Sequence, residues 1–99
     1  MIRHILVVCV GNICRSPMAE ALLERELRGQ DDYTVESAGL GALVGHPASE
    51  QSVALMHELG LDIRAHRARQ IHPDMVSSAD LVLVMEAGHR RAIDDADPT

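Results

Sequence analysis

Both cysteines of this 99-residue chain lie within six residues of each other, in the stretch CVGNICRS at positions 9–16. An apolar run at residues 5–8 precedes Cys9, and Pro17 follows the stretch. Two cysteines are too few for a secreted disulfide scaffold, which needs several bridges. They lack the second pair of ligands that a structural zinc site requires. The spacing instead favours a reactive thiolate at the beginning of a helix.

A loop that joins a strand to a helix and carries few bulky residues can point successive backbone N–H groups toward one spot. When a helix N-terminus is aimed at the same spot, this geometry binds a tetrahedral dianion. Arg15 adds a planar guanidinium that can hold two phosphate oxygens at once. Cys9 would then present its thiolate below the bound phosphate for in-line attack, and Ser16 would donate a hydrogen bond to the sulfur. The loop lacks the Gly-Lys-Ser/Thr ending of nucleotide-binding loops, which argues against ATP or GTP.

The rest of the chain alternates short apolar runs with amphipathic segments. We expect strands at residues 3–10, 33–38 and 80–85. We expect one helix that opens at Ser16-Pro17 and stops at Gly29, and further helices at residues 49–59, 73–78 and 87–93. Strands that alternate with helices predict an α/β fold with a parallel sheet covered on both faces. In such sheets ligands bind at the carboxyl ends of the strands, and the cysteine loop lies at the end of the first one.

Two finer expectations concern individual side chains in these helices. Ser16 is a candidate cap for the first helix, since a serine hydroxyl can accept a hydrogen bond from a free N–H of the first turn. In the helix at residues 49–59, spacing predicts that Leu55, Met56 and Leu59 face the interior. Tyr33 is the only aromatic residue, so the core must consist of aliphatic side chains and methionine.

Charge narrows the class of protein further. The net charge of -6 argues against general binding of nucleic acids or anionic membranes. A local exception occurs between residues 63 and 73, which contain no acid. The basic side chains there are Arg64, His66, Arg67, Arg69 and His72. They either form a solvated charged face or suit an anionic substrate.

The amino terminus shows no signal-peptide pattern, and no apolar stretch approaches the ~20 residues that cross a bilayer. We therefore expect a single domain over residues 1–99 in a reducing compartment, the cytoplasm. We expect neither a bound metal nor a cofactor.

Several motifs together resemble one family. They are CVGNICRSP (9–17), AEALLE (19–24), ESAGL (36–40), HRARQI (66–71) and ADLVLVM (79–85). In this order they resemble the low-molecular-weight protein tyrosine phosphatases of bacterial type, over nearly all of residues 4 to 93. The resemblance implies a three-layer α/β/α fold of the phosphotyrosine phosphatase I type.

The resemblance also implies roles for individual residues. Cys9 corresponds to the nucleophile, Arg15 to the phosphate clamp, and Ser16 to the residue that assists the thiolate. Asn12, Ser37 and His66 match a network that holds the loop, with Asn12 in a strained backbone conformation. Phosphate-binding backbone groups are implied at Val10, Gly11, Asn12, Ile13, Cys14 and Arg15. Cys14 is also the expected redox partner of Cys9 in a reversible disulfide.

Two features depart from the family pattern. The loop after the second strand usually carries an aromatic wall, but here it offers Leu40, Ala42, Leu43 and Val44. Family members also continue for several tens of residues, with a last strand, a last helix and an Asp-Pro loop that bears the general acid. Asp97-Pro98 imitates that loop, but it follows the expected helix at 87–93 without an intervening strand, so we do not assign Asp97 as the acid. We expect a truncated phosphatase domain whose open sheet edge favours a homodimer.

The leading functional expectation is hydrolysis of phosphotyrosine in proteins, with inorganic phosphate as the product. The implied partner is a phosphotyrosine protein, such as a bacterial tyrosine autokinase of exopolysaccharide export. A non-catalytic module that binds phosphate or phosphotyrosine is the alternative, because the acid is missing from the expected place. Arsenate reductase shares the fold and the loop, but it normally uses further downstream cysteines, and none follows Cys14.

Overall fold

The computed structural model of the chain describes residues 2–30 and 32–84. Its elements follow in the order β1 (His4–Cys9), α1 (Arg15–Glu26), β2 (Thr34–Gly39), α2 (Glu50–Glu58), α3 (Pro73–Ser78) and β3 (Leu81–Val84). The expected strands and helices in this part of the chain are confirmed to within a few residues at their ends. The expected helix at residues 87–93, the end of the third strand and Asp97 lie outside the described residues.

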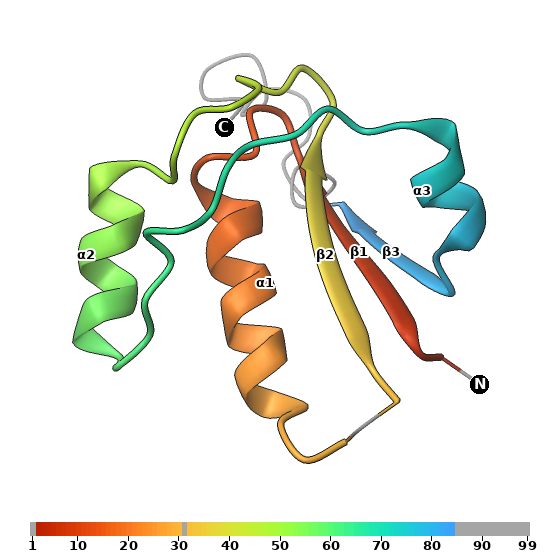
Figure 1. The fold of residues 1–99 in the computed structure, drawn as a ribbon, viewed down its shortest axis with the longest axis horizontal. Helices are drawn as coiled ribbons and strands as arrows, with labels where there is room; N and C mark the ends of the chain where they lie inside the picture. Colours follow the sequence, from red (N-terminus) through yellow and green to blue (C-terminus); the bar gives the residue numbers. More distant parts are fainter. Residues whose placement is uncertain (1, 31, 85–99) are drawn as a thin grey trace.

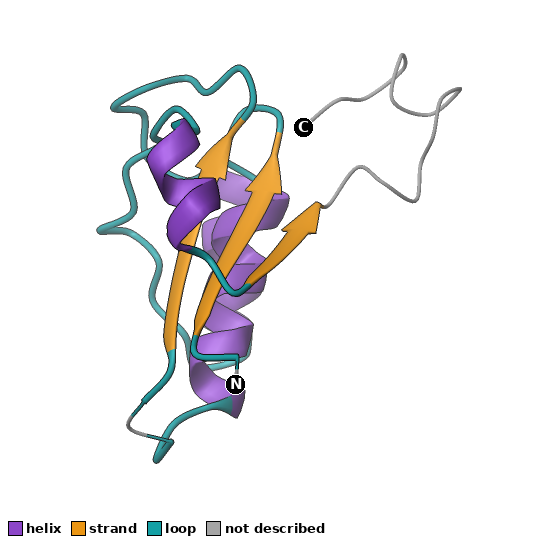
Figure 2. Ribbon diagram, turned by 90° about the vertical axis from the view of Figure 1, so that its right-hand side faces the viewer, coloured by secondary structure: helices purple, strands orange, loops and turns teal. Residues whose placement is uncertain are grey.

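The three strands form one parallel sheet in the order β2-β1-β3. All three arrows point the same way in Figure 2, and the loops that follow β1 and β2 gather at the same end of the sheet. The prediction of an α/β fold with a parallel sheet is therefore confirmed. The carboxyl end of the central strand β1 is where the cysteine loop begins.

Burial on both faces explains why β1 is a continuous apolar run. Ile5 and Val7 face α1, whereas Leu6 and Val8 face the side of α3. Side chains from α1, from the residue that follows it, and from β2 and β3 complete the first cluster: Ala19, Leu23, Leu27, Val35, Leu81 and Leu83. Those that complete the second are Ala38, Ile71, Met75, Ala79 and Val82. Figure 1 shows this layering, with α1 on one side of the sheet and α3 on the other.

Helix α2 packs against α1 rather than against the sheet, as Figure 1 shows. Met56 faces α1, in a third cluster with Ala48 and Ile63. The prediction that Leu55 and Leu59 also face inward is wrong, because each is 51% exposed. A helix outside the main layers has only one narrow face covered, and these two leucines lie beyond it. Among the described residues, no helix is long and apolar enough to span a membrane.

Candidate active site

The loop between β1 and α1 is held from the outside by its carbonyl groups. Six consecutive carbonyls, those of residues 9–14, accept hydrogen bonds of 2.7 to 3.2 Å from neighbouring segments. In order, the donors are the amides of Leu40, Gly41 and Leu43, the ring of His66, the amide of Ser49 and the hydroxyl of Ser52. A trans peptide points its N–H opposite to its carbonyl, and the described part of the chain has no cis peptide. The N–H groups of residues 10–15 therefore face the inner side of the loop.

Cys9 ends β1 with its side chain fully buried at the bottom of this loop. Its sulfur lies 3.2 Å from the donating N–H of Asn12 and 2.9 Å from the hydroxyl of Ser16. Asn12 donates a side-chain N–H to the same Ser16 oxygen at 2.8 Å. Since that bond occupies Ser16 as an acceptor, the Ser16 proton can be directed to the sulfur. The sulfur then accepts two hydrogen bonds.

Asn12 is the centre of the network, fully buried and with a φ of 59°. Its side-chain oxygen must accept at 2.8 Å from the Arg69 N–H, because that amide can only donate. Its side-chain nitrogen therefore faces Ser16 and Ser37, the latter at 3.0 Å. Its carbonyl accepts from Nε2 of His66 at 2.7 Å. The structure thus brings together Cys9, Asn12, Ser16, Ser37 and His66, five of the residues to which the resemblance gave roles.

The network continues to residues that the sequence analysis did not assign to the site. Ser37 donates to Glu20 at 2.6 Å. The guanidinium of Arg69 donates to the Ser37 carbonyl at 2.9 Å and to Glu36 at 2.7 Å. All three of Glu20, Glu36 and Arg69 lie within the quoted motifs, so their positions carried a signal, but tertiary contacts were needed to give them partners.

Glu36 links Arg69 to the first residue of β1, because its other carboxylate oxygen contacts the His4 ring. The hydrogen bond from Arg69 holds the pKa of the Glu36 carboxyl below its ordinary value. Partial burial opposes this effect, and the contact with His4 adds to it. Glu36 is therefore an anion at neutral pH, held between two basic groups.

The second half of the loop is attached to the beginning of α2. Cys14 is half-buried, and its thiol lies 3.5 Å from the Ser49 hydroxyl. Ser49 caps α2 by accepting from the N–H of Ser52, and its own N–H donates to the Ile13 carbonyl. Cys9 and Cys14 are both free thiols in this structure.

Helix α1 begins at Arg15, one residue earlier than expected, with Cys14 at the cap position and no side-chain cap. The prediction that Ser16 caps this helix is therefore wrong. Ser16 is the second helical residue, and its hydroxyl is turned to Cys9 and Asn12 instead. Pro17 occupies the first turn, where its missing N–H removes no helical hydrogen bond.

The basic side chains at residues 64–72 divide between surface and site. Arg64 is exposed and pairs with Asp62 at 2.8 Å, and Arg67 is exposed and donates to the carbonyls of Arg64 and His66. The interpretation as a solvated charged face fits these two. Arg69 instead belongs to the network behind the loop.

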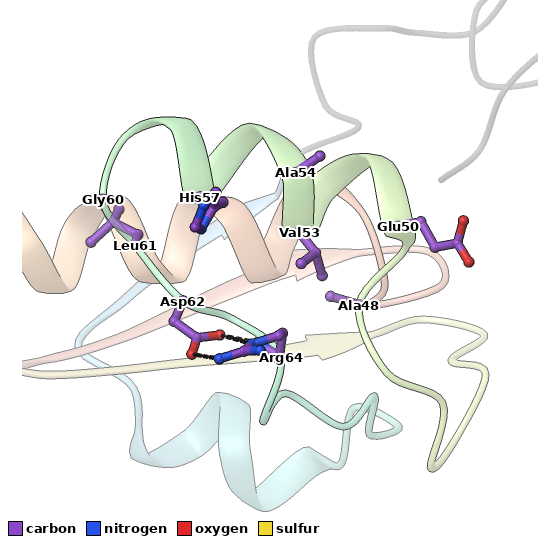
Figure 3. A pocket seen from close by; sticks show the side chains of 9 residues that line it. All are labelled: Ala48, Glu50, Val53, Ala54, His57, Gly60, Leu61, Asp62 and Arg64. Carbon is purple, nitrogen blue, oxygen red and sulfur yellow. Dashed lines mark hydrogen bonds and ion pairs between the residues drawn. The ribbon is translucent and has the colours of Figure 1, made fainter.

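Cys9 lines neither of two hollows in the described part of the chain. One of about 270 Å³ lies behind the loop and is lined by Ser37, His66 and Arg69, among others. A larger one, of about 600 Å³, lies between α2 and the segment at residues 60–64; Figure 3 shows its lining residues and the pair of Asp62 and Arg64. None of the candidate catalytic residues lines the larger hollow. The candidate site is therefore identified by its hydrogen-bond geometry and not by the size of a hollow. Within residues 2–30 and 32–84, no cluster of metal-ligating side chains occurs.

Comparison with known proteins gives a consistent result. The profile of the low molecular weight phosphotyrosine protein phosphatase family matches residues 4–98. A probable low molecular weight protein-tyrosine-phosphatase, EpsP of Ralstonia nicotianae, is 51% identical over 98 residues, which are 99% of this chain and 66% of that protein. The chain thus spans just under two thirds of the length of this relative.

Two solved structures illustrate the likeness in fold. Vibrio vulnificus Wzb in complex with benzylphosphonate has a TM-score of 0.81 and 39% identity, over 99% of this chain and 68% of its own. The YwlE arginine phosphatase from Geobacillus stearothermophilus has a TM-score of 0.77 and 40% identity, over 97% of this chain and 60% of its own. The three-layer fold implied by the resemblance is confirmed by these neighbours.

Proposed function

The chain belongs to the low molecular weight phosphotyrosine protein phosphatase family, and from this premise we propose that it hydrolyses phosphotyrosine in proteins through a phosphocysteine intermediate on Cys9. The observation that carries the proposal is the outward pairing of all six loop carbonyls, which leaves the N–H groups of residues 10–15 directed inward. Such a ring of donors at the start of a helix suits the equatorial oxygens of a phosphoryl group. The sulfur lies at the bottom of that ring.

In the proposed first step the Cys9 thiolate attacks phosphorus, the sulfur–phosphorus bond forms, and the bond to the tyrosyl oxygen breaks. Arg15, which directly follows the loop, would hold two phosphoryl oxygens through its guanidinium. The N–H of Asn12 and the hydroxyl of Ser16 favour the anionic sulfur, because both are within hydrogen-bond distance of it.

In the second step water attacks phosphorus, the sulfur–phosphorus bond breaks, and inorganic phosphate leaves. The same two donors would stabilise Cys9 as it departs as a thiolate. The leaving tyrosyl oxygen needs a proton in the first step, and a general acid typically contributes about 10²–10⁴-fold to such a rate. We assign no acid among the described residues, and Asp97 lies outside them.

The resemblance suggests a tyrosine autokinase of exopolysaccharide export as the protein substrate. The relation to an arginine phosphatase supports phosphoarginine as a second candidate. The need for a free Cys9 thiol supports a reducing compartment, the cytoplasm, as the place of action.

Steady-state hydrolysis of a phosphotyrosine peptide and a phosphoarginine peptide by the purified chain tests the proposal. We expect phosphotyrosine to give the higher kcat/KM. Cys9→Ser should abolish turnover of both while inorganic phosphate still binds. A chain that binds phosphate but hydrolyses neither peptide would favour the non-catalytic binding module instead.

A further inference from the structure

We propose that Gln70 is a specificity-determining positioning residue, whose side-chain amide fixes the apolar rim of the loop so that it can receive an aryl group. The rim is the turn at residues 40–44, which follows β2 and passes the end of β1. The inference rests on the proposed function, since a rim matters only where the loop binds a phosphorylated ligand.

Gln70 holds two peptide groups of the rim with one planar amide. Its nitrogen donates to the Leu40 carbonyl at 2.7 Å, and its oxygen accepts from the Ala42 N–H at 3.0 Å. The backbone on either side of Gln70 reinforces this contact: the Gly39 N–H donates to the Arg69 carbonyl and the Ile71 N–H to the Gly39 carbonyl, both at 2.9 Å. Backbone hydrogen bonds thus join the end of β2 to the segment at residues 69–71, and the Gln70 side chain extends this pairing into the rim.

The opposite edge of the rim is tied to the loop itself. The N–H groups of Leu40, Gly41 and Leu43 donate to the first three loop carbonyls at 2.9 to 3.1 Å. The two segments approach so closely that a Cβ at Gly39 would lie 2.4 Å from the Val10 carbonyl oxygen. These three bonds do not involve Gln70, so the loop should keep its shape when the Gln70 amide is removed.

The surface held in this way is apolar and exposed. Leu40, Leu43 and Val44 are 53%, 47% and 64% exposed, although they lie beside a polar site. Tyr33 is the single aromatic residue of the sequence. It directly precedes β2, at the end of the strand that lies away from the loop. Among the described residues, these aliphatic side chains are the ones that we expect to contact an aryl group. The position of these side chains depends on how rigidly the backbone of the turn is held.

Arg69 and Gln70 are adjacent in sequence but support different parts of the site. The Arg69 N–H binds Asn12 and thereby the loop, whereas the Gln70 side chain binds only the rim. A change at Gln70 should therefore alter recognition of the ligand's aryl part and spare recognition of its phosphate.

Dissociation constants of inorganic phosphate and of benzylphosphonate, measured by calorimetry, separate these two parts without requiring turnover. In Gln70→Leu, of similar size, we expect benzylphosphonate to bind roughly three- to tenfold more weakly, the range that the loss of a hydrogen bond gives. Inorganic phosphate should bind within about twofold of wild type, because the loop retains its own bonds. Gln51→Leu is the matched control, since Gln51 is exposed on α2 and its side chain makes no hydrogen bond to the described residues.

An equal loss for both ligands in Gln70→Leu would overturn the inference, because Gln70 would then support the loop as a whole. Unchanged binding of both would overturn it as well, because the amide would then have no effect on the rim. A wild-type chain that binds neither ligand would instead contradict the proposed function, and the role of Gln70 with it. Thermal unfolding of each variant checks that the fold is kept.

Discussion

Replacing Asn12 tests whether the network around the loop is what holds the loop in shape. The side chain makes three hydrogen bonds, to Ser16, Ser37 and the Arg69 N–H. A net contribution of about 0.5–1.5 kcal/mol for each predicts that Asn12→Ala, which keeps the Cβ, lowers the free energy of unfolding by about 1.5–4.5 kcal/mol. Because small domains are stable by only about 5–15 kcal/mol, such a loss is large.

The left-handed backbone at Asn12 adds a second, separable effect. With a φ of 59°, a residue with a Cβ is strained by about 1–2 kcal/mol, whereas glycine is not. Glycine loses more conformational entropy on folding, which offsets part of this advantage. We therefore expect Asn12→Ala to be less stable than Asn12→Gly by about 1 kcal/mol, although alanine is normally the more stabilising residue.

Urea unfolding of wild type and both variants, followed by circular dichroism at pH 7, measures the two effects. Calorimetric binding of inorganic phosphate should weaken in both variants, since the loop loses the partner that fixes its turn. The reasoning would be refuted if both variants unfolded within about 0.5 kcal/mol of wild type, which is the range of surface substitutions away from special features. If Asn12→Ala were more stable than Asn12→Gly, only the strain argument would be refuted.

Three further predictions concern charge and redox chemistry. Folding lowers the pKa of Glu36, so its contribution to stability is full above its unfolded pKa of about 4.3 and is lost as the pH falls through the lower folded pKa. Between pH 7 and pH 3.5, the free energy of unfolding in urea should therefore decrease less for Glu36→Gln than for wild type. An equal decrease in the two proteins would contradict this. Arg15→Lys should lose most of kcat/KM for a phosphotyrosine peptide, because a point charge cannot replace the bidentate guanidinium; kinetics near the wild-type level would argue against the clamp. Mild peroxide should join Cys9 and Cys14 in a reversible disulfide, detected by peptide mapping; over-oxidised Cys9 beside an untouched Cys14 would count against it.

The sequence predicted the layers and the place of the loop because those depend on local signals. The β-branched apolar run of β1 is buried on both faces, so its pattern is unambiguous. The grouping of Cys9, Asn12, Ser37 and His66, which lie in three separate segments, was instead implied by the resemblance to the family, and the structure brings these residues together.

Contacts that depend on tertiary placement could not be predicted in the same way. Gln70 and Arg69 are adjacent polar residues in sequence, and only the path of the chain between α2 and α3 gives them the rim and Glu36 as separate partners. The orientation of α2 likewise decides that Leu55 and Leu59 are exposed, since their spacing alone suits a buried face. Ser16 has the right type for a helix cap, but the sulfur of Cys9 competes for its hydroxyl.

Trapping the covalent intermediate tests the central claim most directly. The chain is mixed with nitrophenyl phosphate, quenched in acid within the first turnovers, digested and mapped by mass spectrometry. We predict a phosphoryl group on the peptide that carries Cys9, absent from Cys9→Ser and undiminished in Cys14→Ser. Turnover without any phosphorylated Cys9, or with the phosphoryl group on another residue, would contradict the account.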